Sequence, residues 1–214
     1  MTGKIETDKM EEVNSIDFIQ EKDFYKPQKH IFVINGSGGV GKDTFVKYVS
    51  KYINTWNYSS IDSIKKIAKM LGWKNIKDEK SRKFLSDLKM LSSEYNDFPL
   101  EQIKREIKIF YKKPEVELLF IHCREPKEIE KIAELFDIQT ILIKNPYIEK
   151  ITSNEADANV ENFTYHYSIA NNGTLEDLDK TAKAFVNFIK VSDKSNQLKS
   201  FIEKHNTQEK EQVL

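Results

Sequence analysis

The chain has little of several features that would place it in a specialised class. Only one of its 214 residues is a cysteine, Cys123, so an internal disulfide is excluded, and no zinc-ligand spacing is present. No apolar run approaches the roughly 20 residues that a membrane helix needs. The N-terminal residues are polar and lack the apolar core of a signal peptide. These absences favour a cytoplasmic protein without a membrane partner.

An excess of charge of one sign is also missing. Basic and acidic residues number 34 each, so the formal net charge at pH 7 is zero. This balance argues against a nucleic-acid partner that is recognised through a global electrostatic field. Glycine is scarce at 7 residues, yet four of these glycines stand together in one short segment. That segment is the most informative part of the sequence.

Short apolar runs alternate with helical patterns along the middle of the chain. Strands are expected around 31–34, 57–61, 117–121, 140–143 and 165–169, and helices around 44–53, 61–71, 78–95, 100–111, 127–136 and 174–191. Such alternation implies crossover connections and a mostly parallel sheet with helices on both faces, an α/β fold. The flanking segments 1–28 and 192–214 are expected to form a polar arm and a helical tail around a domain over 29–191.

The four clustered glycines follow the first expected strand directly. The segment reads Gly36, Ser37, Gly38, Gly39, Val40, Gly41, Lys42, Asp43 and Thr44. Its glycines let backbone N–H groups turn inward around an anion, and the following helix adds its N-terminal dipole. Lys42 can reach the terminal phosphates of a nucleotide. Because a strand precedes the segment and a helix follows it, the sequence predicts an ATP-binding phosphate loop with Lys42 as a catalytic residue.

One position departs from the usual pattern GxxxxGK[ST]. Asp43 stands where a hydroxyl would hold Mg²⁺. A carboxylate is a good ligand for this cation, so Asp43 is the candidate metal ligand, either directly or through a water. The alternative is a degenerate site. Thr44 would remain available for the α-phosphate.

Two other classes of protein with phosphate loops are disfavoured. A GTPase should carry a guanine-reading NKxD element, and the sequence contains none. A mechanical ATPase should end a buried strand with an acidic residue, whereas strand 117–121 is followed by His122, Cys123 and Arg124. A small-molecule kinase fits better.

Arg124 is the second predicted catalytic residue. It follows the carboxyl end of a parallel strand, where ligands bind in open α/β sheets, and a guanidinium there can clamp phosphate oxygens. The alternative is an ion pair with Glu128. His122 and Cys123 are expected to be packing groups.

Three further residues are candidates for binding the phosphate acceptor. Arg82 and Lys89 lie on one face of the helix 78–95, opposite an apolar stripe, so they would either hold an anionic acceptor or form a solvated face. The stripe consists of Phe84, Leu85, Leu88 and Leu91. Asp62 follows the second strand and would either bind a substrate hydroxyl or start the next helix.

The last part of the domain offers a lid and a base-binding edge. Segment 144–164 lies where kinases carry a mobile lid, to which Lys144 and Lys150 would bring positive charge. An ordinary connection is the alternative. Asn171, Asn172 and Gly173 are expected to border adenine, although a turn that starts a helix explains them too.

The phosphate loop with its GKDT ending, the strand followed by Arg124, and the closing segment 153–178 resemble the nucleoside monophosphate kinase superfamily. The likeness extends to deoxynucleoside monophosphate kinases of bacteriophages, animal-type phosphomevalonate kinases and bacterial adenylate kinase-like proteins. It implies a P-loop kinase fold with a five-stranded parallel sheet, Mg²⁺-ATP as donor, and a phosphorylated small molecule as acceptor. By this likeness Lys42 and Arg124 bind transferring phosphates, and Arg82 and Lys89 hold the acceptor. The likeness also implies that Asn171, Asn172 and Gly173 lie near adenine.

The chain departs from these relatives at His122, where they tend to place an acidic residue, and in a lid without arginine. The first hypothesis is transfer of the γ-phosphate of ATP to a nucleoside or deoxynucleoside monophosphate. The alternatives are a kinase of another phosphorylated metabolite and a regulatory protein that binds ATP without turnover. Whether the protein forms a homodimer stays an open question.

Overall fold

A computed structural model of the chain describes residues 29–76, 78–148 and 159–192. The strands are β1 (His30–Asn35), β2 (Thr55–Ser59), β3 (Leu118–His122), β4 (Gln139–Lys144) and β5 (Tyr167–Ala170). The helices are α1 (Lys42–Val49), α2 (Asp62–Met70), α3 (Glu79–Asn96), α4 (Phe98–Tyr111) and α5 (Pro126–Phe136), with a further helix over 175–192. Each expected strand and helix within the described residues is therefore present.

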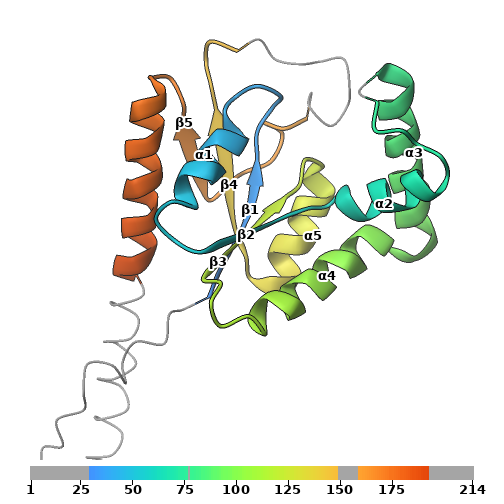
Figure 1. Cartoon of the computed structure of the whole chain (residues 1–214), viewed down its shortest axis with the longest axis horizontal. Coiled ribbons are helices and arrows are strands. Elements are labelled where there is room, and N and C mark those ends of the chain that lie inside the picture. The colour runs from blue at the N-terminus through green and yellow to red at the C-terminus, as the bar shows by residue number, and fades with distance from the viewer. Residues whose placement is uncertain (1–28, 77, 149–158, 193–214) are drawn as a thin grey trace, which may run out of the picture. The chain divides into compact units, whose positions relative to one another are not determined.

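The five strands form one sheet in the order β2-β3-β1-β4-β5, and each neighbouring pair is parallel. The strand that precedes the phosphate loop, β1, lies in the middle of this sheet (Figure 1). All five carboxyl ends meet at one edge, which is where the loops that follow β1, β2 and β3 gather. The predicted α/β class with a five-stranded parallel sheet is confirmed.

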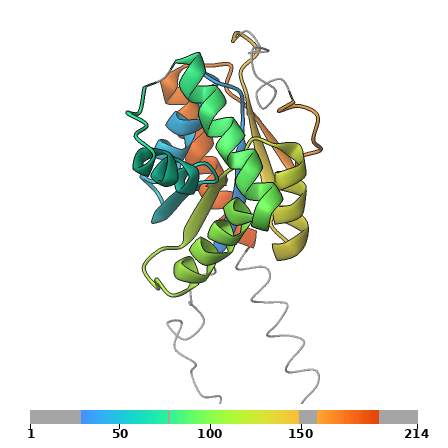
Figure 2. The ribbon, with the colours of Figure 1, turned by 90° about the vertical axis from the view of Figure 1, so that its right-hand side faces the viewer.

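Each face of the sheet has its own apolar core because side chains alternate along a strand. On one face Phe32 and Ile34 pack with residues of α1 and of the helix over 175–192, including Phe45 and Val186. On the other face Val33 packs with residues of α4 and α5. The sheet thus has helices on both faces, as the pattern of apolar runs predicts (Figures 1 and 2).

The helix α3 lies outside these two cores. It packs against α2 and α4, and its N-cap Asp78 accepts a hydrogen bond from the Ser81 backbone N–H at 2.7 Å. The prediction of a buried apolar stripe is wrong for Leu91, which is 59% exposed, and Lys89 is the buried residue of this helix. The reason is that α3 turns toward the sheet edge the face that carries Lys89, while no element among the described residues covers Leu91.

Asn35, the last residue of β1, joins the segments that surround the phosphate loop. Its side chain is fully buried and its Oδ1 accepts a hydrogen bond from Gly36 N–H at 2.8 Å. Its Nδ2 donates to the Arg124 carbonyl at 3.2 Å and to the Tyr165 hydroxyl at 2.7 Å. The Tyr165 hydroxyl donates in turn to the Val160 carbonyl at 2.7 Å. One amide therefore ties the start of the loop to the segment after β3 and to the segment before β5.

The predictions for residues 1–28, for Lys150 and for most of the tail 192–214 lie outside the described residues. The same holds for the middle of the expected lid, 149–158. Within the described ranges, no helix is long and apolar enough to cross a membrane.

Replacing Asn35 with Ala should lower the free energy of unfolding by about 2–4 kcal/mol, because Gly36 N–H and the Arg124 carbonyl lose their partner in a buried place. Urea denaturation with a matched Asn162→Ala variant measures this. Asn162 is exposed and its Nδ2 donates to Asn159 Oδ1 at 2.7 Å, so its replacement should change stability by less than about 0.5 kcal/mol. Equal effects of the two substitutions would contradict the role given to Asn35.

Candidate functional site

The phosphate loop lies between β1 and α1 at the carboxyl edge of the sheet, as the sequence predicts (Figure 1). Gly39 and Gly41 have φ values of 84° and 91°, a left-handed conformation that favours glycine. A Cβ at Gly36 would lie 2.8 Å from the Ile143 carbonyl oxygen, and one at Gly41 would collide with the side chain of Asn171. These glycines are therefore required by the turn and by close neighbours. The backbone can cradle an anion at the N-terminus of α1.

Lys42 begins α1, and its ammonium makes two contacts. Its Nζ donates to Asp43 Oδ1 at 2.5 Å and to His122 Nδ1 at 2.8 Å. The Lys42 side chain is 14% exposed, whereas that of Asp43 is 88% exposed. The structure thus confirms that Lys42 lies at the phosphate loop and adds His122, at the end of β3, as its neighbour.

Asp43 has the properties of a cation ligand. The hydrogen bond from Lys42 and the positive charges of Lys42 and Arg124 hold the pKa of its carboxyl below the usual value. The group is ionised at neutral pH and open to solvent, so its oxygens suit Mg²⁺. Arg124 follows β3, is exposed, and is near enough to act on Asp43 electrostatically. Lys42 and Arg124, the two predicted catalytic residues, thus both lie near Asp43 at the carboxyl edge of the sheet.

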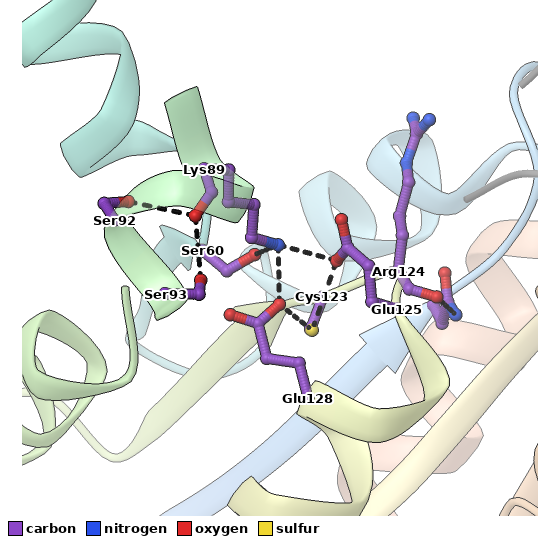
Figure 3. A network of polar contacts seen from close by, with 9 residues as sticks. Ser60, Lys89, Ser92, Ser93, Cys123, Arg124, Glu125 and Glu128 are labelled. Atoms are coloured by element: carbon purple, nitrogen blue, oxygen red, sulfur yellow. Dashed lines mark hydrogen bonds and ion pairs between the residues drawn. The ribbon is translucent and has the colours of Figure 1, made fainter. Parts of the chain in front are cut away.

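The acceptor candidate Lys89 has a different environment from the one its helix face predicts. Its Nζ contacts Glu125 Oε2 and Glu128 Oε2, both at 2.6 Å, and Ser60 Oγ at 3.2 Å (Figure 3). Burial lowers the pKa of this ammonium, but the charges of Glu128 and Glu125 outweigh burial and raise it overall. The ammonium therefore stays charged and holds α3 to the start of α5.

The Cys123 thiol belongs to the same cluster. Its Sγ donates to Glu128 Oε2 at 2.9 Å, and burial raises the pKa of the thiol far above its ordinary value. Cys123, Glu125 and Glu128 bring one ligand atom each within 4.8 Å of one another. The Lys89 ammonium already lies between the two carboxylates as their shared ion-pair partner, so we assign no metal here. Figure 3 shows that the Arg124 side chain points away from this cluster, so the alternative pairing of Arg124 with Glu128 is not the arrangement seen.

The other acceptor candidates lie on neighbouring elements. Asp62 is the first residue of α2, accepts a hydrogen bond from Ser59 N–H at 3.1 Å, and pairs with Lys65 at 3.3 Å. It therefore does start a helix, one of its two predicted roles. Arg82 is exposed on α3. Acceptor binding by Asp62, Arg82 and Lys89 stays a prediction.

The segment after β5 contacts the phosphate loop. Asn171 Nδ2 donates to the Val40 carbonyl at 2.9 Å, and Asn171 N–H donates to the Lys144 carbonyl at 2.7 Å. Thr174 Oγ1 accepts from Asp177 N–H at 3.2 Å and so caps the helix over 175–192, as a helix-start turn would. Asn171 therefore lies beside the glycine-rich loop, and the contact of Asn171, Asn172 and Gly173 with adenine stays a prediction. Lys144, at the end of β4, is exposed.

Sequence reasoning missed two residues of this site. Asn35 could have been singled out as a polar residue that ends an apolar strand directly before a glycine. His122 ends the same strand that Arg124 follows, so its position near the sheet edge could have been predicted. Its contact with Lys42 could not, because it depends on the pairing of β3 with β1, which no local pattern reveals.

No family model and no curated protein matches the chain. Solved structures that are similar to it include the following three. The protein TT1252 from Thermus thermophilus is 17% identical with a TM-score of 0.45, covering 75% of this chain and 97% of that one. The shikimate kinase from Aquifex aeolicus is 11% identical with a TM-score of 0.39, covering 75% and 98%. A sugar kinase from Janibacter is 15% identical with a TM-score of 0.36, covering 75% and 95%. At these scores none of them decides what this chain acts on.

Replacing Lys89 with Met should destabilise the protein by about 3 kcal/mol at neutral pH, because the largely buried Glu128 carboxylate and the half-exposed Glu125 carboxylate lose their shared counter-charge. Chemical denaturation measures the loss. The matched control is Lys83→Met on the same helix, since Lys83 makes an exposed pair with Asp87 that is worth about 0.5 kcal/mol or less. Losses of similar size in the two variants would contradict the structural role of Lys89.

Proposed function

We propose that the chain is an ATP-dependent phosphotransferase that moves the γ-phosphate of ATP to a small-molecule acceptor. The observation that carries this proposal is the Lys42 ammonium, largely buried at the mouth of a glycine-rich loop between the central strand and α1. Phosphoryl transfer depends on positioning and charge stabilisation rather than on covalent chemistry. A preformed anion cradle with a lysine beside it supplies both.

Each residue of the site has a distinct part in this proposal. The loop backbone from Gly36 to Gly41 binds the phosphate chain through its N–H groups, and the N-terminus of α1 adds a favourable dipole. Lys42 and Arg124 meet the negative charge that develops during transfer. Asp43 would hold Mg²⁺, which supplies charge neutralisation between the phosphates when it is bound. Asn171 supports the loop from the β5 side through its contact with the Val40 carbonyl.

The first acceptor to test is a nucleoside or deoxynucleoside monophosphate. The resemblance in the sequence supports this choice, and so does the position of Arg82 and Asp62 on the helices that follow β2. A second acceptor class is another phosphorylated metabolite of the phosphomevalonate type. Because Lys89 is neutralised by Glu125 and Glu128, recognition of the acceptor phosphate would fall mainly to the arginines.

A panel of phosphate acceptors incubated with Mg²⁺-ATP tests the function. Release of ADP should rise when the correct acceptor is added, and Lys42→Ala should reduce this release by about a hundredfold or more while the fold persists. The matched control is Lys47→Ala, an exposed lysine of the same helix, which should keep the activity. A flat response to every acceptor would favour a protein that binds ATP without turnover, and full activity of Lys42→Ala would contradict the mechanism.

Asp43→Ala should raise the Mg²⁺ concentration needed for half-maximal activity by about tenfold, because one oxygen ligand or its bridging water is lost. Asp43→Ser places the usual hydroxyl at this position and should restore most of the metal dependence. Activity titrated against Mg²⁺ measures the shift, with Asp179→Ala as the control because Asp179 pairs with Lys51 outside the site. An unchanged Mg²⁺ requirement in Asp43→Ala would remove Asp43 as the metal ligand.

A further inference from the structure

The contact between Lys42 and His122 joins two groups that are both normally basic. Lys42 Nζ lies 2.8 Å from His122 Nδ1. An ammonium has three donors and no acceptor, so the hydrogen bond requires an unprotonated Nδ1 on the imidazole. The other ring nitrogen, Nε2, lies 3.4 Å from Asn57 Oδ1, an oxygen that can only accept. His122 is therefore neutral, with its proton on Nε2 and its lone pair directed at Lys42.

The electrostatic surroundings favour the same neutral form. Burial, followed by the charge of Lys42, lowers the pKa of His122 to about 4, while Asp43 and Asp62 act in the opposite direction. The charged groups facing the imidazole thus come from α1 (Lys42 and Asp43) and from α2 (Asp62). At physiological pH the ring offers Lys42 an acceptor without a charge.

The second partner of Lys42 is a weak competitor. Asp43 is 88% exposed, and an ion pair with so exposed a carboxylate is screened by water. His122 is half-buried at the end of β3 and is held from β2 by Asn57. The imidazole is therefore the partner that directs the ammonium toward the end of β3.

We propose that His122 is a positioning residue that holds the Lys42 ammonium in the nucleotide-free protein and releases it to the phosphate chain when a nucleotide binds. This inference rests on the phosphate site of the proposed function. The bond that breaks is the hydrogen bond from Nζ to Nδ1, and the bonds that form run from Nζ to phosphate oxygens. The binding free energy of a ligand must compensate for the lost hydrogen bond between Lys42 and His122. A polyphosphate with several negative charges compensates for it better than a single phosphate group does.

This transfer of the Lys42 ammonium from His122 to the phosphate chain, called the handover below, changes the surroundings of the imidazole. Nδ1 loses the ammonium that it accepts from, and a negatively charged phosphate chain arrives near it. Both changes favour the protonated ring, so the pKa of His122 should rise when the ligand binds. The pKa of the His122 imidazole therefore reports whether the Lys42 ammonium is bound to His122 or to the phosphate chain.

NMR of the ¹⁵N-labelled imidazole tests the handover, with ADP and inorganic tripolyphosphate as probes. In the free protein His122 should show the Nε2–H tautomer and a titration near pH 4. Either probe should shift the Nδ1 resonance and move the titration upward by about one pH unit or more. Lys42→Ala should raise the titration of His122 without any ligand and reduce its response to a bound probe, because the ammonium is already absent. Binding of a probe with no change at His122 would overturn the inference.

Two substitutions separate the handover from a merely structural role. His122→Leu removes the acceptor, so the free protein no longer loses a hydrogen bond on binding, and the Kd for tripolyphosphate should fall by about three- to tenfold. His122→Asn places an amide oxygen near the position of Nδ1 and should keep the wild-type Kd. An unchanged or higher Kd in His122→Leu would contradict the proposal, and the NMR of the unsubstituted protein decides the matter should this variant fail to fold.

The outcomes also separate this inference from the proposed function. Binding of ADP with a response at His122 but without transfer to any acceptor would support the handover and refute the kinase. Transfer of phosphate with no response at His122 would support the kinase and refute the handover. Failure of ADP and tripolyphosphate to bind would refute both.

Discussion

The buried amide of Asn35 is the interaction on which the rest of the site depends. A polar side chain that is fully buried must satisfy its hydrogen bonds inside the protein, and Asn35 does so by joining three separate segments. It sets the first peptide of the phosphate loop against the segment after β3. The pairing of β1 with β3 brings Lys42 and His122 to the same edge, and the Asn35 amide adds a direct link from the start of the phosphate loop to Arg124.

The charged side chains at the sheet edge have two separate roles. The Lys89 cluster uses an ammonium and two carboxylates to attach α3, a helix that has almost no apolar contact with the cores. A buried ion pair of this kind adds little net stability, but it is costly to break and so defines one arrangement of the helix. Lys42 and Arg124, by contrast, are placed where a ligand can reach them. Arg124 directly precedes Glu125 in the sequence after β3, yet its side chain points away from the ion-pair cluster of Lys89 (Figure 3).

The fold and the phosphate loop could be predicted because short stretches of the sequence are enough to indicate both. Continuous apolar runs, such as 31–34, indicate strands buried on both faces, and the glycines before Lys42 report a backbone conformation. The environment of Lys89 could not be predicted in this way. Helical spacing places Lys89 on the polar face, but that face is turned toward Glu125 and Glu128, which belong to a distant part of the chain. The exposure of Leu91 has the same cause, since periodicity indicates which residues share a face and not which face is covered.

The identity of the residue at 122 decides how firmly the loop lysine is held before a ligand arrives. A carboxylate at the same place, half-buried and 2.8 Å away, would form a charge-assisted pair that a phosphate chain must compete with directly. A neutral imidazole accepts the same hydrogen bond without adding an opposing charge to that of the exposed Asp43. The departure of this chain at His122 is therefore compatible with a working phosphate site, because it lowers the cost of releasing Lys42 while still keeping the ammonium in place.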